Sequence, residues 1–333
     1  MTNRRESILS ENLLEVQGLK IHYPVKSKNR LGNSVSWSKA VDGVSFTVKK
    51  GETFGVVGES GCGKSTTGKA IIRLLEPTEG KILFDGKDIS GYSRKELARK
   101  IQMIFQDPFS SLDPRMTAGT CIAEPLSVHK VGTKKERRDR AVQLMKDVGL
   151  REDQYERFPH EFSGGQRQRI GVARAIALQP ELVVCDEPVS ALDVSIQAQI
   201  LNLMKELQNK YKLTYIFISH NLSVVKFLCD RVAVMYLGHI VELADKKELF
   251  DNPCHPYTKA LLDAIPIADP DVKSMNGELT GDVPSPLNPP SGCCFHTRCP
   301  YATERCRKEA PVLHETAKGH TVACHQFHES ETL

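Results

Sequence analysis

Residues 53–65 read TFGVVGESGCGKS, and this stretch decides the fold. Its first part, TFGVV, reads as a buried strand that runs straight into a glycine-rich turn. The second part, GESGCGKS at 58–65, fits the pattern G-x-x-x-x-G-K-[ST], and a helical stretch follows it. Glycines at these positions let backbone N–H groups converge on phosphate oxygens, and the positive end of the following helix points at the same oxygens. The stretch therefore predicts a phosphate-binding loop.

The pattern also gives roles to side chains within the loop. Lys64 is expected to reach the terminal phosphates of a nucleotide, and the Ser65 hydroxyl is expected to ligate Mg²⁺. The loop residues expected to contact the nucleotide are Gly58, Glu59, Ser60, Gly61, Cys62, Gly63, Lys64, Ser65 and Thr66.

Two adjacent carboxylates follow a second apolar run, LVVC at 182–185. Asp186 and Glu187 thus lie at the carboxyl end of a strand, where open α/β sheets bind ligands. Asp186 is placed to hold the metal ion through water, and Glu187 to polarise an attacking water. The alternative is that the two acids only cap the next element. The presence of a phosphate loop in the same chain makes the role at a nucleotide site the favoured interpretation.

The surrounding pattern is that of an α/β sheet with crossover helices. TYIFISH at 214–220 is expected to form another buried strand, and apolar residues between Ser195 and Lys212 have the spacing of a helix with one buried face. Segment 26–39 is expected to be a surface loop insertion. The basic segment 132–140 is expected to be the solvated face of a helix, with a partner-binding patch as the alternative.

A third motif, FSGGQ at 162–166, precedes the acidic strand. Here the sequence resembles the ATP-binding cassette (ABC) family, whose signature is usually written LSGGQ, with Phe162 in place of the leucine. Further positions are similar to family motifs: Tyr23 to the aromatic that stacks on adenine, Gln106 to the lid glutamine, Ser190–Asp193 to the D-loop and His220 to the switch histidine. Each has a plain structural alternative by itself. Together, in this order and spacing, the motifs identify the chain as a member of the family.

The resemblance implies an α/β fold. Its parts are a phosphate-loop NTPase (RecA-like) core, an antiparallel β subdomain, an inserted helical subdomain and a small cysteine-rich C-terminal extension. The expected nucleotide-binding domain covers 13–265, with the helical subdomain at about 109–177, and a linker with the extension covers 266–333. The shift to DVPSPLNPPSG suggests that this extension is a separate small module.

The resemblance also implies a mechanism that needs two cassettes. Residues Ser163, Gly164, Gly165 and Gln166 of one chain would close over the ATP of a second cassette arranged head to tail. The residues expected to act in catalysis are Glu187, His220, Lys64 and Gln106. Those expected around Mg²⁺ are Ser65, Gln106 and Asp186. With one cassette, the chain must pair with a copy of itself or with a sister subunit.

The segment NPCHPYTKALLDAIP at 252–266 resembles an element of oligopeptide and dipeptide importers. Its plain interpretation is a helix that begins at Pro256 and packs Leu261, Leu262 and Ile265 inward. The resemblance implies an ATP-hydrolysing motor subunit for uptake of di-/oligopeptides, of the F type. The alternatives are nickel or sugar import, or a soluble nucleic-acid-acting ABC ATPase, which the absence of long coiled-coil insertions disfavours.

The implied partners are a second ABC ATPase of the D type, two transmembrane permease subunits and an extracytoplasmic peptide-binding protein. A net charge of +4 gives no argument for nucleic acid. No apolar run approaches the roughly 18 residues of a membrane span, and the N-terminus lacks the pattern of a signal peptide. We therefore expect a chain kept in the cytosol, peripheral to the cytoplasmic face of the cell membrane.

Half of the chain's ten cysteines lie in the tail: Cys293, Cys294, Cys299, Cys306 and Cys324. A reducing cytosol disfavours disulfides. Several members of the resembled family bind a 4Fe–4S cluster there, and the matching positions are Cys293, Cys299, Cys306 and Cys324. Zinc, with ligands among His296, His320 and His325, and metal-free packing are the alternatives. Cys294 could compete with Cys293.

Overall fold

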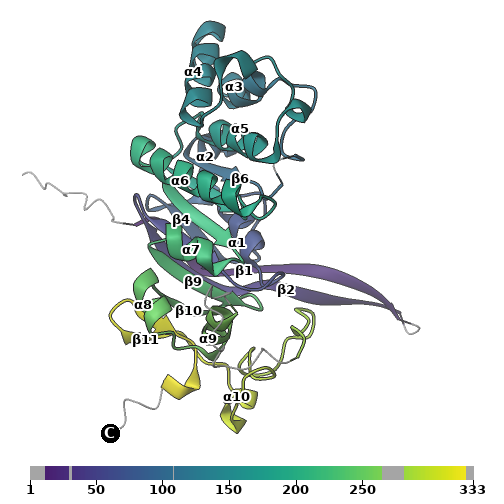
Figure 1. The fold of residues 1–333 in the computed structure, drawn as a ribbon. Coiled ribbons are helices and arrows are strands. Elements are labelled where there is room, and N and C mark those ends of the chain that lie inside the picture. Colours follow the sequence, from purple (N-terminus) through teal and green to yellow (C-terminus); the bar gives the residue numbers. More distant parts are fainter. Residues whose placement is uncertain (1–11, 30–31, 108, 265–280, 328–333) are drawn as a thin grey trace, which may run out of the picture.

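The computed structural model describes residues 12–29, 32–107, 109–264 and 281–327. A helical cap lies at one end of the molecule, the strands with their covering helices lie in the middle, and the C-terminal segment lies at the other end (Figure 1). The smaller sheet is antiparallel, with the strand order β2-β1-β4-β5. Its strands are β1 (Asn12–Asn29), β2 (Gly32–Lys49), β4 (Glu79–Phe84) and β5 (Lys87–Asp88). This sheet confirms the expected antiparallel β subdomain.

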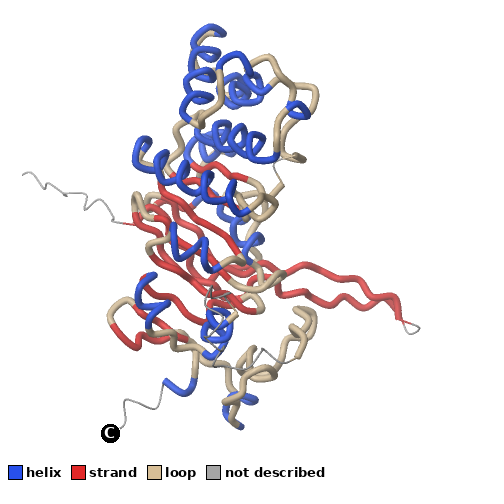
Figure 2. Tube along the Cα trace, viewed as in Figure 1, coloured by secondary structure: helices blue, strands red, loops and turns tan. Residues whose placement is uncertain are grey.

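Strands β1 and β2 form a hairpin that projects from the body of the molecule (Figure 2). The prediction of a loop at 26–39 is wrong, because 26–29 and 32–39 continue these strands, with pairs such as Lys26 with Val35. The reason is that part of this hairpin is exposed to solvent. At Ser36 and Trp37 the strand is exposed, so it shows none of the apolar alternation by which a half-buried strand is recognised.

The larger sheet has the strand order β11-β12-β10-β9-β3-β8-β7-β6. The pairs β3/β8, β3/β9, β7/β8 and β6/β7 are parallel. The strands are β3 (Thr53–Val57), β6 (Ile101–Ile104), β7 (Leu182–Asp186), β8 (Thr214–Ser219), β9 (Arg231–Tyr236), β10 (His239–Asp245), β11 (His314–Ala317) and β12 (His320–Val322). Every residue of β3, β7 and β8 is buried, which explains their unbroken apolar character and confirms the α/β core.

Helices cover this sheet and build a cap at one end of the molecule (Figure 1). The helices along the sheets are α1 (Lys64–Ile71), α2 (Arg94–Lys100), α6 (Val194–Tyr211), α7 (Leu222–Leu228), α8 (Lys246–Asp251) and α9 (Pro256–Asp263). The cap contains α3 (Ala118–Val128), α4 (Lys134–Asp147) and α5 (Gly164–Ile176). Short 3₁₀ turns occur at Ile89–Gly91, Glu152–Gln154 and Pro159–Glu161. The amphipathic helix predicted at 195–212 is α6, and the basic face predicted at 132–140 lies on α4.

The C-terminal segment contains α10 (Glu304–Lys308) and the hairpin β11/β12. It does not form the separate module that we expected, because β12 pairs with β10 and extends the large sheet. Phe295, 1% exposed, belongs to the main hydrophobic core. Most of the expected linker lies outside the described residues. Among the described helices, none is both long and apolar enough to cross a membrane.

Candidate functional site

The predicted phosphate loop joins β3 to α1, and its backbone requires glycine at two positions. Gly58 and Gly63 have φ angles of +148° and +103°. A Cβ atom on Gly58 would lie 2.2 Å from the Met235 carbonyl oxygen, and one on Gly63 would lie 2.2 Å from that of Ala40. A side chain at either position is therefore excluded for two reasons: it would collide with a carbonyl oxygen of another segment, and the φ angle is unfavourable for any residue but glycine. Helix α1 begins at this loop without a side-chain cap, so its first N–H groups face the loop without a competing acceptor.

Lys64 lies against the inner side of the loop, with only 4% of its surface exposed. Its Nζ donates to the carbonyl oxygens of Gly58 and Glu59 at 2.7 and 2.8 Å. The same ammonium contacts the Cys62 sulfur at 3.7 Å. The loop carbonyls thus hold a buried positive charge at the point where phosphate oxygens are expected.

Asp186 ends β7 opposite the start of α1. The Ser65 hydroxyl donates to Asp186 Oδ1 at 2.7 Å, so the two expected magnesium residues are in direct contact. Burial raises the pKa of Asp186 above its ordinary value, although the hydrogen bond from Ser65 acts in the opposite direction. A hydroxyl beside a carboxylate is a suitable pair of oxygen ligands for Mg²⁺.

Glu187 follows in a backbone conformation with φ +45°, which is uncommon for a residue with a side chain. Its N–H donates to the Ile218 carbonyl oxygen at 3.0 Å. Gln106 donates through Nε2 to Glu187 Oε2 at 3.1 Å, and His220 Nδ1 lies 3.0 Å from Glu187 Oε1. Both carboxylate oxygens therefore have a partner from another strand end, and the three side chains form one group.

Most of these residues line a common pocket of about 730 Å³, and Asp186 lies behind Ser65 outside its lining. The predicted residues in its lining are Gly58, Glu59, Ser60, Gly61, Gly63, Lys64, Ser65, Thr66, Gln106, Glu187 and His220. Ala40 and Leu261 also line it, and neither is among the predicted site residues. For Leu261, the sequence signal is the apolar spacing of the segment at 252–266, which predicts packing and not a site.

Several predicted residues lie elsewhere. Cys62 is buried and does not belong to the lining. Tyr23, on β1 and 39% exposed, is not part of the pocket wall. The signature residues Ser163, Gly164, Gly165 and Gln166 are also absent from the wall.

The signature forms the beginning of α5. Ser163 Oγ accepts a hydrogen bond from the Gln166 N–H at 3.3 Å, and Gln166 Oε1 accepts one from the Ser163 N–H at 3.1 Å. This capping box explains why SGGQ starts a helix. Ser163 is exposed.

Four of the five tail cysteines lie close together. The Cys293 N–H donates to the Cys306 carbonyl oxygen at 2.8 Å. Burial raises the pKa of Cys293 to about 11, and the neighbouring thiols of Cys306, Cys324 and Cys299 add to the increase. Burial and then the Cys299 and Cys306 thiols likewise raise the pKa of Cys324. The fifth, Cys294, interacts among these cysteines only with Cys293.

The histidines weighed as alternative ligands have other contacts. His296 Nδ1 lies 2.9 Å from the Cys293 carbonyl oxygen. His325 Nε2 lies 3.0 Å from the Glu309 carbonyl oxygen, and His320 Nε2 lies 2.7 Å from Glu242 Oε1.

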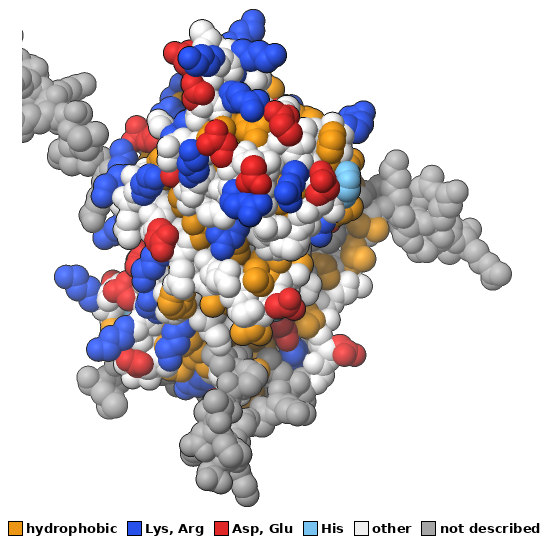
Figure 3. Space-filling view, turned by 45° about the horizontal axis from the view of Figure 1, so that its top comes forward, with side chains coloured by type: hydrophobic (Ala, Val, Ile, Leu, Met, Phe, Trp, Pro, Cys, Tyr) orange, Lys and Arg blue, Asp and Glu red, His pale blue; other side chains and the backbone are white. Residues whose placement is uncertain are grey.

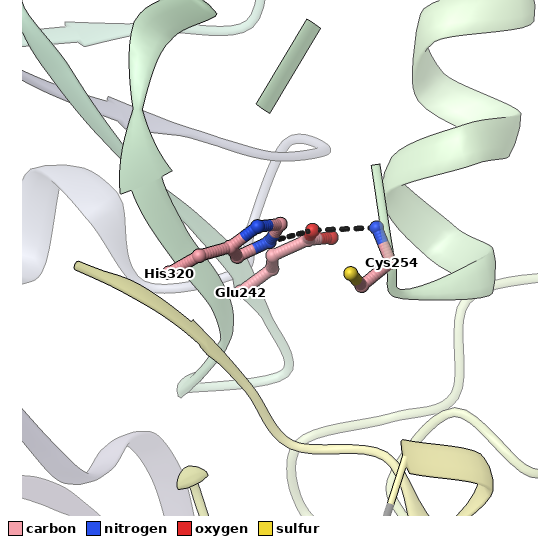
Figure 4. A group of neighbouring side chains, drawn as sticks. All are labelled: Glu242, Cys254 and His320. Carbon is pink, nitrogen blue, oxygen red and sulfur yellow. Dashed lines mark hydrogen bonds and ion pairs between the residues drawn. The ribbon is translucent and has the colours of Figure 1, made fainter. Parts of the chain in front are cut away.

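His320 belongs instead to a buried group with Glu242 and Cys254, whose potential ligand atoms lie within 4.8 Å of one another (Figure 4). Glu242 Oε1 accepts from His320 and from the Cys254 N–H, each at 2.7 Å, and Oε2 accepts from the His255 N–H at 2.9 Å. Both oxygens of the Glu242 carboxylate thus accept hydrogen bonds, and these bonds connect β10 to β12 and to the start of α9. We call the group of Glu242, Cys254 and His320 the Glu242 staple. No local sequence pattern predicts it.

Comparison with known proteins agrees with this architecture. The family model for ABC transporters matches residues 41–190, and that for the oligopeptide/dipeptide transporter C-terminal region matches 241–306. The oligopeptide transport ATP-binding protein AppF of Bacillus subtilis (strain 168) is 55% identical over 323 residues, which are 95% of this chain and 98% of AppF.

Solved structures are similar over most of the chain. A dimeric ATP-binding cassette in a post-hydrolysis state, bound to ADP and Pi, has a TM-score of 0.61 and 28% identity, covering 70% of this chain and 98% of that one. The cbiO1 protein of Clostridium perfringens, part of the ABC transporter complex cbiONQ, has a TM-score of 0.62 and 29% identity, covering 73% of this chain and 92% of its own. The chain therefore belongs to the ABC transporter family, among the ATP-binding proteins that carry the oligopeptide/dipeptide transporter C-terminal region.

Proposed function

We propose that this chain is an ATP-hydrolysing motor subunit of an importer for di-/oligopeptides. The observation that carries the proposal is the pocket that brings together the Lys64 ammonium, the Ser65 hydroxyl and the group formed by Gln106, Glu187 and His220. The match to the oligopeptide/dipeptide transporter C-terminal region supports peptide as the substrate class, as does the similarity to AppF.

The residues of the pocket divide the work of hydrolysis. The phosphate loop and Lys64 bind the phosphates, and Ser65 with Asp186 would hold Mg²⁺, which neutralises phosphate charge when bound. Glu187 accepts a proton from the attacking water or orients it, and Gln106 and His220 fix the position of the Glu187 carboxylate. Tyr23 is proposed to stack on the adenine.

The pocket is proposed to be completed by a second cassette, which supplies a signature equivalent to Ser163, Gly164, Gly165 and Gln166. Support comes from the position of the signature outside the chain's own pocket and from the dimeric cassette to which the chain is similar. We propose a D-type sister chain as this partner. Two permease subunits and an extracytoplasmic peptide-binding protein would complete the importer, with this chain on the cytoplasmic face of the membrane.

The experiment is uptake by cells whose gene for this chain is deleted and then restored. The restored gene is expected to restore uptake of labelled tri- and tetrapeptides. A Lys64→Ala variant that accumulates to the same level is expected not to restore it. Restored uptake of nickel or of a sugar, with peptide uptake unaffected by the deletion, would replace peptide as the substrate.

A nucleic-acid-acting ATPase is the less favoured function. On the face shown in Figure 3, Lys and Arg side chains are interspersed with Asp and Glu and form no continuous basic field. Salt-sensitive binding of the purified chain to DNA or RNA would reverse this preference.

We also propose that Cys293, Cys299, Cys306 and Cys324 hold a 4Fe–4S cluster. Among the described residues, the group with ligand atoms mutually within 4.8 Å is the Glu242 staple and includes none of these four thiols. The ligands of a single zinc ion, with Zn–S bonds of about 2.3 Å, lie closer together than this limit, which supports a larger cofactor over zinc. Iron and acid-labile sulfide in anaerobically purified protein, both lost in Cys299→Ser, are expected. Zinc without iron would contradict the proposal.

A further inference from the structure

The C-terminal segment forms an ion pair with Glu59 of the phosphate loop. The Arg298 guanidinium donates to both Glu59 carboxylate oxygens, at 2.7 Å from Nη1 and 3.1 Å from Nη2. The Glu59 N–H donates to the Tyr257 hydroxyl at 2.9 Å. The Glu59 carbonyl oxygen accepts from Lys64 Nζ at 2.8 Å. Every polar part of Glu59 is therefore engaged, and its carbonyl holds the lysine that faces the phosphates.

Arg298 is itself fixed by the cysteine-rich segment. It directly precedes Cys299, and its N–H donates to the Phe295 carbonyl oxygen at 3.0 Å. Phe295 packs edge-on against Tyr236 at 5.2 Å between ring centroids, and tilted against Tyr257 at 5.4 Å. The guanidinium carbon lies 5.9 Å from the Tyr236 ring centroid. The position of Arg298 thus depends on the turn between Cys293 and Cys299.

The energetics of the pair make it a firm connection. The Arg298 side chain is 5% exposed and that of Glu59 is 27% exposed. A two-bond contact between guanidinium and carboxylate fixes orientation as well as distance. Removing one partner leaves the other charge in a site that water reaches poorly, which costs far more than losing a surface ion pair. A movement of Arg298 is therefore expected to move Glu59 with it, because separating the two charges is costly.

These contacts cross the boundary between the two family regions. Glu59 lies in the part that matches the ABC transporter family, and Arg298 lies in the part that matches the oligopeptide/dipeptide transporter C-terminal region. The geometry points to a role that neither region has alone: Arg298 is a positioning residue for the phosphate loop, and through Glu59 it makes nucleotide binding depend on the cysteine-rich turn. This inference rests on the proposed function and adds a regulatory input to the same site.

The first test is the affinity of the purified chain for a fluorescent ATP analogue. Arg298→Met and Glu59→Gln are each expected to weaken binding at least tenfold. The double variant should lose no more affinity than the more affected single variant, because the two residues act as one unit. In the assembled complex, KM for ATP is expected to rise more than kcat falls. The matched control is Arg305→Met, whose arginine pairs with Glu309 at an exposed site, with an expected change below twofold.

If the Arg298→Met chain does not fold, Tyr257→Phe provides a second test of the contacts of Glu59. It removes the hydroxyl that accepts from the Glu59 N–H and keeps the ring packed on Phe295, so a three- to tenfold loss of affinity is expected. A folded Arg298→Met chain with affinity within twofold of the parent would overturn the inference. A parent chain that binds no nucleotide would instead contradict the proposed function.

The dependence on the cysteine-rich turn needs its own measurement. Cys299→Ser is expected to reduce bound iron and to weaken nucleotide binding, and little further loss is expected when Arg298→Met is added. Loss of iron with unchanged affinity would show that the turn does not act through Arg298. Because the readouts are iron content and affinity, the result does not depend on turnover.

Discussion

At the scale of single residues, Glu187 shows how the surroundings fix the position of a side chain in the pocket. Glu187 has a φ of +45° and a partner on each carboxylate oxygen. Such a conformation costs about 1–3 kcal/mol and persists only where the surroundings impose it. Here the imposing contact is the hydrogen bond from its N–H to Ile218 at the end of β8.

Glu187→Gln is expected to separate binding from turnover. The amide keeps the size of the carboxylate but cannot accept a proton from water, so kcat for ATP hydrolysis should fall by about 10²–10⁴-fold. Nucleotide affinity should stay within about threefold, because Glu187 does not belong to the phosphate loop. Phosphate release and equilibrium binding on the same preparation measure both quantities, and unchanged hydrolysis would remove Glu187 from its role.

Gly63→Ala is expected to destroy nucleotide binding. The φ of +103° is strained for alanine, and the new Cβ would lie 2.2 Å from the Ala40 carbonyl oxygen. Gly61→Ala provides the matched control in the same loop, because its φ is +80° but no atom beyond the adjoining residues lies within 4 Å of the added Cβ. It should lose about 1 kcal/mol of stability from strain alone. Equal binding by the two variants would show that contact with Ala40 does not shape the loop.

At the scale of elements, the C-terminal hairpin is attached to the large sheet by the Glu242 staple. Burial by itself would raise the pKa of Glu242, but hydrogen bonds from His320 and from two backbone N–H groups lower it below its ordinary 4.5. The hydrogen bond to Glu242 raises the pKa of His320 above its ordinary 6.5, and Glu248 on α8 adds to this at 3.7 Å. The staple is therefore a charged pair inside the protein.

The staple predicts a pH dependence of stability. The raised pKa of His320 means that its contribution is complete below pH 6.5 and is lost as pH rises through the raised value. The lowered pKa of Glu242 means that its contribution is complete above pH 4.5 and is lost as pH falls through the lowered value. The staple should thus stabilise the hairpin most between these limits.

Hydrogen exchange of β12 measured at about pH 6 and about pH 8.5, after correction for the intrinsic rate, should show greater protection at the lower pH. His320→Gln should remove this difference while it leaves the protection of β7 unchanged. The same difference in the variant would mean that another group produces it.

At the scale of the whole molecule, the signature residues lie outside the lining of the chain's own pocket, which supports the proposed pairing with a second cassette. The capping box of Ser163 and Gln166 starts α5 and leaves Ser163 exposed. The match to the solved dimeric cassette covers 70% of this chain and 98% of that one.

Ser163→Arg is expected to leave ATP binding by the isolated chain within about twofold and to reduce hydrolysis by the assembled complex by at least tenfold. The reason is that the bulky cation would lie at the phosphates of the partner's nucleotide and not at those of its own chain. Equilibrium binding and ATPase assays check the two halves. A comparable loss of binding in the isolated chain would place Ser163 in its own pocket.

Much of the site could be predicted from local sequence. The phosphate loop, the acids after β7 and the helix start at Ser163 depend on residues close together in the chain, where the types of residue restrict the backbone directly. Parallel strands β3, β7 and β8 are recognisable because burial on both faces leaves an unbroken apolar run. The prediction fails at 26–39, where Ser36 and Trp37 have no such burial.

By itself, then, the sequence indicated the phosphate loop and the acids after β7, because short-range spacing and backbone restrictions suffice for both, and its resemblance to the ABC family implied the helical cap. Only the tertiary structure decided that the tail extends the large sheet, that His320 belongs to Glu242, and that Arg298 holds Glu59 across 239 positions of chain. The physical reason is that an ion pair or an added strand depends on the path of the whole chain. Nothing in the residues beside Arg298 indicates which carboxylate it will meet.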